Sequence, residues 1–491
     1  MDSEKAAENV ELILSALGVY EAEINGVRIS DYVLAPGWTS YEHRLQYQEY
    51  DITDMVREKE NILTVTVGKG WYRSRMADWA DKEEAARRQE QPCGLIAELR
   101  ITYSDGEKEV LSSDGSWEYG ESPVRFSEIY DGERYDACFQ TGNWKKAVPL
   151  CGNKEILIPQ EGPVIREMER VKAKSILQTP KGETVIDFGQ EIAGYVEFTV
   201  DAKAGEAVHI LHGEVLDSER NFYRENYRSA KAEITYICRE GSQTWHPGLT
   251  FFGFRYIKLD AFPGNIRNVK EDQFTAIAVY SDMKRTGEFI CSDPLLNRLV
   301  SNVFWGQKSN FIDVPTDCPQ RDECLGWTGF LGTPLILHAL SNYGHTDLAY
   351  SLLLRREYPS WLYPVEKGAT TIWEHWDGIR PDGKFWSADM NSFNHYSYGA
   401  AADWIYEVAA GITPEEDAPG FQRVRIEPHP DERLAWLKAS IQTRNGVVSS
   451  GWSCEADRVR YEITAEMPAR IVIDGKTENV EPGKYTFWGS I

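Results

Sequence analysis

Apolar and polar residues alternate along most of the first 283 positions, which is the pattern of half-buried strands. In LGVYEAEINGVRI the alternation is interrupted by Asn25-Gly26, a pair typical of two-residue hairpin turns. TVIDFGQEIAGYVEFTV contains two β-rich runs separated by Gly and Ala, and AVHILHGEVL and FRYIKLDAF follow it after short polar turns. We therefore predict two β-sandwich domains, an accessory one over 1–165 and a second one over 166–283. Within the first, the charged stretch 78–91 is predicted to be a short helix or an exposed loop.

After residue 283 the apolar residues recur at helical spacing. Asp293 is a favourable N-cap with Pro294 at the first helical position, and Thr333 is predicted to cap a second helix that ends at Gly344. We predict a helical domain over 284–412. Its helices are expected over 293–310, 333–343, 346–358 and 397–410.

Strands return after the helical domain. VRYEITAEM places Val459, Tyr461 and Ile463 on one face of a strand. We predict a C-terminal β domain over 413–491. The expected fold class is therefore multidomain β plus α, with β-sandwich domains at both ends of the chain and helices between them.

Charge and cysteine content exclude several classes of function. The 491 residues carry a formal net charge of −24, which argues against nucleic acid or an anionic membrane as a partner. No stretch approaches the length of a membrane span, and the acidic start MDSEKAAENVELILSALGVY differs from a secretory signal. The eight cysteines are scattered without a CxxC pair, as in reduced cytoplasmic proteins. We therefore expect a cytoplasmic protein.

Two polar segments interrupt the helical region, and loops of this kind often carry functional residues. The first, DVPTDCPQRDECLGWTGF over residues 313–330, crowds Asp317, Asp322 and Glu323 around Arg321. Because like charges disfavour ionisation, Asp317 and Asp322 are expected to raise the pKa of Glu323, while Arg321 stabilises whichever carboxyl stays charged. A carboxyl that stays protonated is what a glycosidase uses as its general acid.

The second segment, residues 367–400, carries the candidate for the other carboxyl that sugar hydrolysis needs. Glu374 lies between Trp373 and His375, and it would act as a base on water. The residue types alone leave a simpler interpretation open, in which the acids of both segments cap helices or bind surface cations.

Metal binding is a further interpretation of the same acids. Four of them, Asp313, Asp317, Asp322 and Asp389, offer the oxygen ligands that calcium prefers, but their spacing is not that of an EF-hand loop. His375 and His395 lack the i, i+4 spacing of a helical zinc site. We therefore expect no metal.

Several stretches resemble bacterial α-L-rhamnosidases of glycoside hydrolase family 78. DCPQRDECLGWTG is similar to the family's acid motif, and GATTIWEHWDG with MNSFNHYSYGA is similar to its second signature. LGVYEAEINGVRISDYVLAPGWTSY, DFGQEIAGYVEF and GITPEEDAPGFQRVRIEPHP resemble its accessory domain, its concanavalin-like β-sandwich and the entry to its C-terminal domain. The resemblance implies an (α/α)6-barrel catalytic domain that removes terminal α-L-rhamnose from plant glycosides or pectic fragments with inversion. It implies no cofactor.

The resemblance also assigns roles to individual residues. Glu323 matches the general acid, and Glu374 matches the general base that activates water. An inverting pair would hold these two carboxyl groups about 6.5–9.5 Å apart. The expected substrate-binding residues are Asp317, Arg321, Asp322, Trp327, Trp373 and His395.

The chain departs from the family pattern in the helical domain. Phe330 stands where the acid motif normally ends in Asp, which removes a sugar-binding carboxylate. Glu323 and Glu374 are only 51 residues apart. The 129 residues over 284–412 have room for at most about eight helices, whereas a double-ring barrel needs twelve. We predict an internal deletion near Phe330 and a truncated helical domain.

Three functional outcomes follow from this pattern. The retained carboxyl pair favours a rhamnosidase of impaired activity, whereas the departures favour an inactive carbohydrate-binding relative or a gene remnant. A truncated barrel would also leave the apolar stripes of Leu295, Leu299 and Phe304, and of Leu352 and Leu353, without some of their neighbours. We therefore expect the helical segment to self-associate, to pack on the neighbouring β domains or to stay loosely packed.

Overall fold

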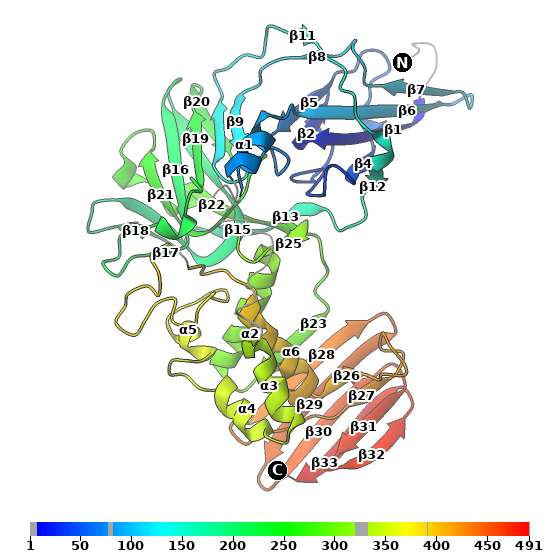
Figure 1. The fold of residues 1–491 in the computed structure, drawn as a ribbon, viewed down its shortest axis with the longest axis vertical. Coiled ribbons are helices and arrows are strands. Elements are labelled where there is room, and N and C mark those ends of the chain that lie inside the picture. Colours follow the sequence, from blue (N-terminus) through cyan, green and yellow to red (C-terminus); the bar gives the residue numbers. More distant parts are fainter. Residues whose placement is uncertain (1–6, 77–81, 320–331, 390, 491) are drawn as a thin grey trace. The chain divides into compact units, whose positions relative to one another are not determined.

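The computed structural model falls into two compact units (Figure 1). It describes residues 7–76, 82–319, 332–389 and 391–490. Unit 1 consists of residues 1–282 and 308–324, and unit 2 consists of residues 283–307 and 325–491. Each unit is described by itself.

Unit 1 begins with a β-sandwich. Its five-stranded sheet has the order β12-β4-β1-β6-β7, and its three-stranded sheet has the order β3-β2-β5. Leu12 and Leu14 of the larger sheet share one core with Tyr20 and Ala22 of the smaller sheet, because alternation turns one side of each sheet inward. The strands are β1 (Ala7–Leu17), β2 (Val19–Ile24), β3 (Val27–Arg28), β4 (Leu45–Asp51), β5 (Leu63–Gly68), β6 (Gly94–Tyr103), β7 (Lys108–Ser112) and β12 (Leu157–Pro159).

Two local predictions for this sandwich are confirmed. Asn25 and Gly26 join β2 to β3 with φ angles of 55° and 78°, the left-handed conformations that a tight hairpin turn requires. The charged stretch after β5 forms a helix, α1 (Lys82–Glu90).

The second half of unit 1 is a ten-stranded sheet centred on one long strand. Its main path is β13-β22-β15-β21-β16-β19-β10-β9, and β14 and β20 also pair with β15. β15 is a single strand of 19 residues, so the predicted division of this stretch into two runs is wrong. Its register against β21 shifts between Asp187 and Ile192. The strands are β9 (Val124–Glu128), β10 (Gly132–Asp136), β13 (Ile165–Lys172), β14 (Ser175–Gln178), β15 (Thr184–Ala202), β16 (Ala207–Gly213), β19 (Glu233–Ile237), β20 (Gly241–Trp245), β21 (Phe252–Ala261) and β22 (Phe274–Ser281).

Hydrogen bonding in unit 1 crosses the expected boundary between residues 165 and 166. β9 and β10 precede that boundary in the sequence, yet β10 pairs in parallel with β19. Short two-stranded ladders complete the described part of the unit. They are β8 (Glu118–Tyr119) with β11 (Lys145–Lys146), β17 (Val215–Leu216) with β18 (Phe222–Tyr223), and β24 (Phe311–Ile312) with β25 (Val314–Pro315).

The helices of unit 2 follow the predicted order with local corrections. Asp293 caps α2, since its Oδ1 accepts the backbone N–H of Leu295 at 2.7 Å. Thr333 lies inside α3, so its assignment as an N-cap is wrong, but Gly344 does follow that helix with a φ of +83°. α5 was not predicted, because five residues are too few to show a helical period. The elements are α2 (Pro294–Ser309), α3 (Gly332–Asn342), α4 (Thr346–Leu353), α5 (Leu362–Glu366), the 3-10 turn η7 (Ser397–Ala400), α6 (Ala401–Trp404) and the π-helical η8 (Ile405–Ala409).

The C-terminal strands form a β-sandwich of two sheets. One has the order β23-β28-β29-β30-β33 and the other β26-β27-β31-β32. Val459, Tyr461 and Ile463 of β30 are buried on one face, as predicted. The strands are β23 (Gly287–Cys291), β26 (Ile412–Pro414), β27 (Val424–Ile426), β28 (Trp436–Thr443), β29 (Gly446–Glu455), β30 (Arg458–Ala465), β31 (Ala469–Ile473), β32 (Lys476–Val480) and β33 (Gly483–Ser490).

The helices and this sandwich share one apolar core, and they lie side by side in Figure 1. Trp404 of α6 is fully buried, stacks edge-on against Tyr350 of α4 and donates its indole N–H to Ser341 at 2.9 Å. Trp452 of β29 donates its indole N–H to the carbonyl of Ala409 at 2.9 Å. Of the three expected outcomes, packing on a neighbouring β domain is therefore confirmed.

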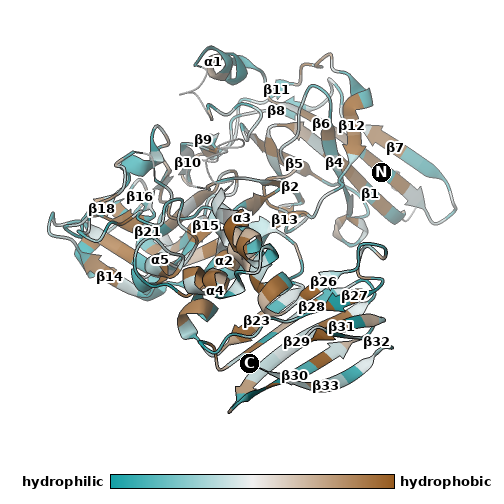
Figure 2. Cartoon of the chain, turned by 60° about the horizontal axis from the view of Figure 1, so that its bottom comes forward, coloured by the Kyte–Doolittle hydropathy of each residue, from teal (hydrophilic) through white to brown (hydrophobic). Residues whose placement is uncertain are grey.

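The apolar side chains that were predicted to lose packing neighbours are not the ones that are exposed. Leu299 and Leu353 are buried, and Leu295, Phe304 and Leu352 pack partly buried against the shared core. The exposed apolar side chains lie instead on and beside α3 and α4, where Figure 2 shows hydrophobic segments. They are Leu335, Ile336, Tyr343 and Leu348, with exposed fractions of 62%, 40%, 83% and 50%.

Two further expectations bear on the chain as a whole. Within the described ranges, no helix is both long and apolar enough to cross a membrane. All seven cysteines in the same part of the chain are free thiols.

Candidate functional site

The acid segment is described only as far as Pro319. Five residues singled out from the sequence, Arg321, Asp322, Glu323, Trp327 and Phe330, lie outside the described residues. Asp317 precedes them and is partly exposed, next to the buried Cys318. The distance between the two predicted catalytic carboxyls therefore stays a prediction.

Asp313, the first acid of this segment, anchors the segment within unit 1. Its Oδ2 accepts the backbone N–H of Trp38, and its own N–H donates to the hydroxyl of Ser281 at 3.0 Å. Burial raises the pKa of Asp313 to about 6, and the bond from Trp38 opposes this shift. Gly37 has a φ of +93°, and a Cβ placed there would lie 2.6 Å from the Asp313 carboxylate. These contacts give Asp313 a structural role.

The second segment is folded around Glu374 by strand-like hydrogen bonds. The N–H of Glu374 donates to the carbonyl of Ser392 at 2.9 Å, and the N–H of Ser392 donates to Glu374 Oε2 at 2.7 Å. Two residues before Glu374, the carbonyl of Ile372 accepts the N–H of His395 at 2.7 Å. Glu374 is only 7% exposed, and its Oε1 lies 3.8 Å from His375 Nε2. The carboxylate is therefore held in one orientation.

The tryptophans close to Glu374 in the sequence pack against other aromatic rings. Trp373 is 5% exposed and meets Phe393 edge-on with ring centroids 5.1 Å apart, so its indole is a packing element of unit 2. Trp376 contacts Trp361 with the same centroid separation. The cavity beside these rings, lined also by Asn302, holds no more than about one water molecule, which is far less than a sugar needs.

His395 is buried in the same fold and has a defined tautomer. Its Nδ1 accepts the N–H of Ser397 at 3.1 Å, so the proton of the neutral ring lies on Nε2. The ring stacks on Tyr396, which is 56% exposed. The position and the tautomer of His395 are therefore fixed within the Glu374 segment.

Two exposed aromatic residues near Glu374 were not assigned a site role from the sequence. Trp386 is 38% exposed and stacks on His375 with ring centroids 3.8 Å apart. Tyr396 is the other. The density of aromatic residues in the segment pointed to both, but only the structure separates exposed rings from buried ones such as Trp373. Exposed rings are the ones that can stack on the apolar face of a sugar.

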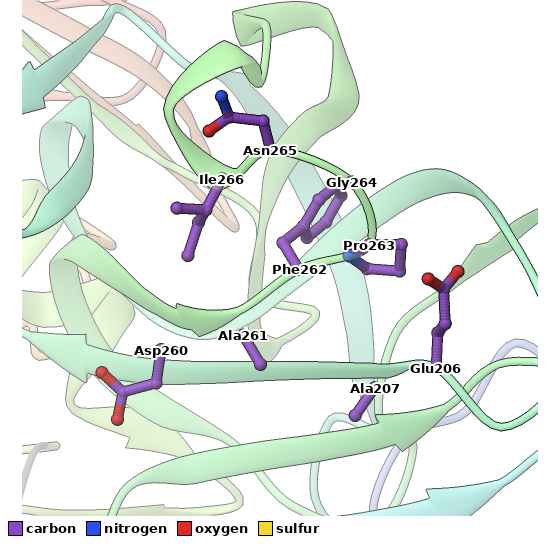
Figure 3. Close-up of a pocket in the computed structure, with 9 residues that line it drawn as sticks. All are labelled: Glu206, Ala207, Asp260, Ala261, Phe262, Pro263, Gly264, Asn265 and Ile266. Carbon is purple, nitrogen blue, oxygen red and sulfur yellow. The ribbon is translucent and has the colours of Figure 1, made fainter.

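A hollow on unit 1 offers little chemistry for a carbohydrate (Figure 3). It is lined by the end of β21 and the turn that follows, with Glu206 and Asp260 as its carboxylates. Its aromatic residue, Phe262, is 8% exposed and packs against Phe198 and Phe274. No aromatic platform faces the hollow among its lining residues.

Buried carboxylates also occur in and beside the ten-stranded sheet, and they were not predicted from the sequence. Glu191 and Glu214 are 2% and 1% exposed. Burial and the charge of Glu214 raise the pKa of Glu191 well above its usual value. Asn226 donates to Glu214 Oε2 at 2.7 Å. Glu191 lies on β15 and Glu214 directly follows β16, and both strands pair with β21. The sequence did not reveal this arrangement, because strand pairing and not sequence spacing brings the two residues into one layer.

Comparison with known proteins gives matches along nearly the whole chain. The α-L-rhamnosidase N-terminal domain matches residues 5–169, and the concanavalin-like domain of bacterial α-L-rhamnosidases matches 177–280. The six-hairpin glycosidase domain of the same enzymes matches in two pieces, 284–329 and 328–409, and their C-terminal domain matches 411–486.

The chain belongs to the bacterial α-L-rhamnosidase family.

The curated relatives that this chain matches are longer than the chain. An α-L-rhamnosidase from Streptomyces avermitilis is 27% identical over 669 aligned positions. The alignment covers 91% of this chain, but the chain spans only 64% of that relative's length. Because 669 positions exceed the 491 residues of the chain, the alignment crosses a large gap.

Two crystal structures of α-L-rhamnosidases have closely similar folds. The Aspergillus terreus enzyme superposes with a TM-score of 0.91 at 26% identity, over 99% of this chain and 83% of its own. The S. avermitilis enzyme in complex with L-rhamnose gives a TM-score of 0.90 at 25% identity, over 99% of this chain and 70% of its own.

Proposed function

We propose that this protein is an inverting glycoside hydrolase that removes terminal α-L-rhamnose from rhamnosylated glycosides or oligosaccharides, with activity impaired by a shortened helical domain. One observation carries the proposal. Glu374 is a buried carboxylate oriented by the N–H of Ser392, within a segment that the family's six-hairpin glycosidase domain also matches. A general base needs a fixed position of this kind next to the water that it activates.

In the proposed reaction, Glu374 removes a proton from water as the water attacks the anomeric carbon. Glu323 donates a proton to the glycosidic oxygen as the bond to the aglycone breaks. Attack opposite to the leaving group inverts the configuration at that carbon. Asp317, Arg321, Asp322, Trp327 and His395 are proposed as the sugar-binding set, and the exposed ring of Trp386 is added to it in place of the buried Trp373.

Impaired activity is proposed because the helical domain is short. The six-hairpin domain matches in two pieces that meet at residues 328–329, next to Phe330, and this supports an internal deletion within an (α/α)6 barrel. Positioning supplies much of an enzyme's rate, and an error of about 1 Å can cost on the order of 100-fold. A barrel that lacks helices would lose part of the wall that orients the sugar.

The test is hydrolysis of an aryl α-L-rhamnoside by the purified chain, with the anomer of the released sugar followed by NMR. We expect turnover far below the roughly 1–1000 s⁻¹ of ordinary enzymes, with the inverted anomer formed first. Glu374→Gln should lower the rate by at least about 100-fold, the usual minimum for a general base. Glu366→Gln, which changes an exposed carboxylate of the same unit, is the control and should leave the rate unchanged.

Two outcomes would contradict the proposal. Unchanged turnover in Glu374→Gln would exclude Glu374 as the base, and ordinary turnover in the parent chain would exclude impairment.

If the parent shows no hydrolysis but binds L-rhamnose in calorimetry, the second candidate, an inactive carbohydrate-binding relative, replaces the first. The exposed ring of Trp386 favours that candidate, so Trp386→Ala should then abolish binding.

Self-association through the helical segment is also proposed. Leu335, Ile336, Tyr343 and Leu348 present apolar area to solvent on two adjacent helices, and exposed apolar patches usually become interfaces. Sedimentation velocity should show dimers or larger species, and Leu335→Lys with Tyr343→Ser should shift them to monomer. Tyr119→Ser removes a comparably exposed ring from unit 1 and should change nothing. A monomeric parent chain at every concentration would refute the idea.

The cytoplasmic location and the absence of a cofactor or catalytic metal stay predictions.

A further inference from the structure

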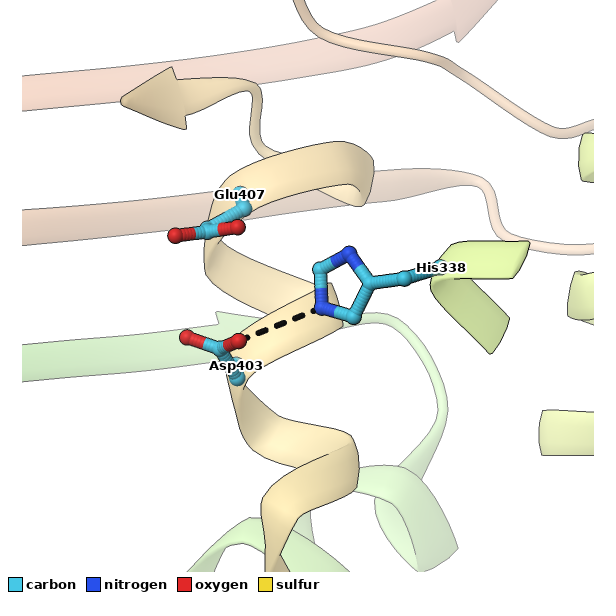
Figure 4. A group of neighbouring side chains, drawn as sticks. All are labelled: His338, Asp403 and Glu407. Atoms are coloured by element: carbon cyan, nitrogen blue, oxygen red, sulfur yellow. Dashed lines mark hydrogen bonds and ion pairs between the residues drawn. The ribbon is translucent and has the colours of Figure 1, made fainter. Parts of the chain in front are cut away.

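Three ligand-type side chains meet on the surface of unit 2. His338 comes from α3, Asp403 from α6 and Glu407 from η8 (Figure 4). One ligand atom of each residue lies within 4.8 Å of the other two. Figure 4 shows the imidazole reaching from its own helix toward the two carboxylates, which lie one turn apart on the facing helix.

The distances suit a small tetrahedral cation. Zinc binds nitrogen and oxygen ligands at roughly 2.0–2.2 Å, so two ligands of one tetrahedral ion lie about 3.3 Å apart. His338 Nε2 and Asp403 Oδ2 are already 3.2 Å apart. Glu407 is exposed and has rotatable bonds, so its carboxylate needs only a modest rotation to complete a three-ligand face.

The electrostatics of the cluster also favour a cation. Burial and the charge of Asp403 raise the pKa of Glu407, and His338 opposes that shift. In the part of the chain that the structure describes, neither carboxylate forms an ion pair with Lys or Arg. Among the described residues, the imidazole of His338 is the basic group that pairs with Asp403, and a divalent ion would neutralise both carboxylates.

We propose that His338, Asp403 and Glu407 form a binding site for a divalent transition metal of the zinc class, which links α3 to the α6–η8 segment. The mixed nitrogen and oxygen donors fit zinc better than calcium or magnesium, which prefer oxygen ligands alone. Water completes the coordination. The ion stabilises the packing of α3 against the helix that carries Trp404.

The experiment uses the full chain after treatment with a chelator. Calorimetric titration with zinc should show one equivalent bound at this site, and zinc should raise the temperature of unfolding because the metal binds the folded state. His338→Ala and Glu407→Gln should each weaken zinc binding by more than about tenfold, since loss of an outer-shell partner alone costs 10–100-fold. Cobalt in place of zinc should show the weak absorption of nitrogen and oxygen ligation, without thiolate bands, which separates this site from the free cysteines.

The matched control is His209→Ala. His209 also lies between two acids, but its Nε2 faces Glu233 at 3.3 Å and its Nδ1 faces Asp260 at 3.7 Å, so the acids approach opposite ring nitrogens. This variant should bind zinc as the parent does. Far-UV circular dichroism checks that each variant is folded, and Glu407→Gln changes only an exposed group. Absent binding, or binding that survives both His338→Ala and Glu407→Gln, would reduce the cluster to a His–Asp ion pair.

Discussion

Units 1 and 2 differ in where they bury ionisable side chains. In unit 1 the described buried Asp, Glu and His side chains lie in and beside the ten-stranded sheet, and they include Glu128, Glu133, Asp187, Glu191, His212 and Glu214. In the described part of unit 2, the buried carboxylate and imidazole groups are those of Glu374 and His395, both from one polar segment. The rest of the interior of unit 2 is an apolar core shared by helices and strands.

The difference shows that a buried carboxylate does not by itself indicate catalysis. Glu128 Oε2 accepts the backbone N–H groups of Tyr130 and Asp131 at 2.7 and 2.8 Å, and it fixes a turn between two strands. Burial raises its pKa, as it would for a catalytic acid. What distinguishes Glu374 is its setting, in a segment that also presents the ring of Trp386 to solvent.

The largest effect is expected from the apolar core of unit 2. Trp404→Ala removes a fully buried indole and should lower the free energy of unfolding by about 3–5 kcal/mol. Hydrogen exchange should show that amide protection decreases in α2–α6 and the C-terminal strands, while the sheets of unit 1 keep their protection. Trp488→Ala, at an indole that is 49% exposed, should cost about 0.5 kcal/mol or less. Equal loss of protection in both units would mean that the units unfold together.

The second prediction concerns how the free energy of unfolding of unit 1 depends on pH. Burial raises the pKa of Glu133 from 4.5 to about 8, so between these values the folded state holds a proton that the unfolded state has lost. The stability from this group is complete below pH 4.5 and falls by about 1.4 kcal/mol per pH unit as pH rises toward 8.

Glu133→Gln should flatten that dependence, which denaturant unfolding from pH 5 to 9 would measure. The amide cannot ionise, yet its oxygen can still accept the N–H groups of Gly248 and Leu249, which lie 3.3 and 3.0 Å from the native carboxylate. Glu83→Gln, at an exposed position of α1, should leave the slope as in the parent. A parent slope that persists in Glu133→Gln would assign it to other groups.

The smallest expected effect is a difference in stability between two glycine-to-alanine variants of unit 1. It distinguishes the cost of backbone strain from the cost of crowding at the added Cβ. Gly37→Ala forces a left-handed φ on alanine and places its Cβ against the Asp313 carboxylate, at a cost of about 2–3 kcal/mol. Gly26→Ala has a similar φ of +78° with nothing within 4 Å of the Cβ, and should cost about 1 kcal/mol. If the two variants are equally stable, the contact between Gly37 and Asp313 does not constrain the fold.

Local patterns were enough to predict the order of the elements. Period-two alternation predicted the strands at both ends of the chain, and Asp293 as an N-cap predicted the start of α2. Both features depend only on neighbours within a few residues. The Asn25-Gly26 turn was predicted for the same reason. The residues of the Glu374 segment were also found from sequence, since acids and aromatic rings are dense there.

Partners distant in the sequence could not be predicted in this way. The sequence by itself determined which stretches are strands or helices and which segments carry carboxylates. Only the tertiary structure decided that β10 pairs with β19, that Asp313 anchors a loop near Trp38, and that Trp373 is buried while Trp386 is exposed. It also decided that His338 meets Asp403. The physical reason is that strand pairing and helix packing join residues whose separation along the chain leaves no periodic trace.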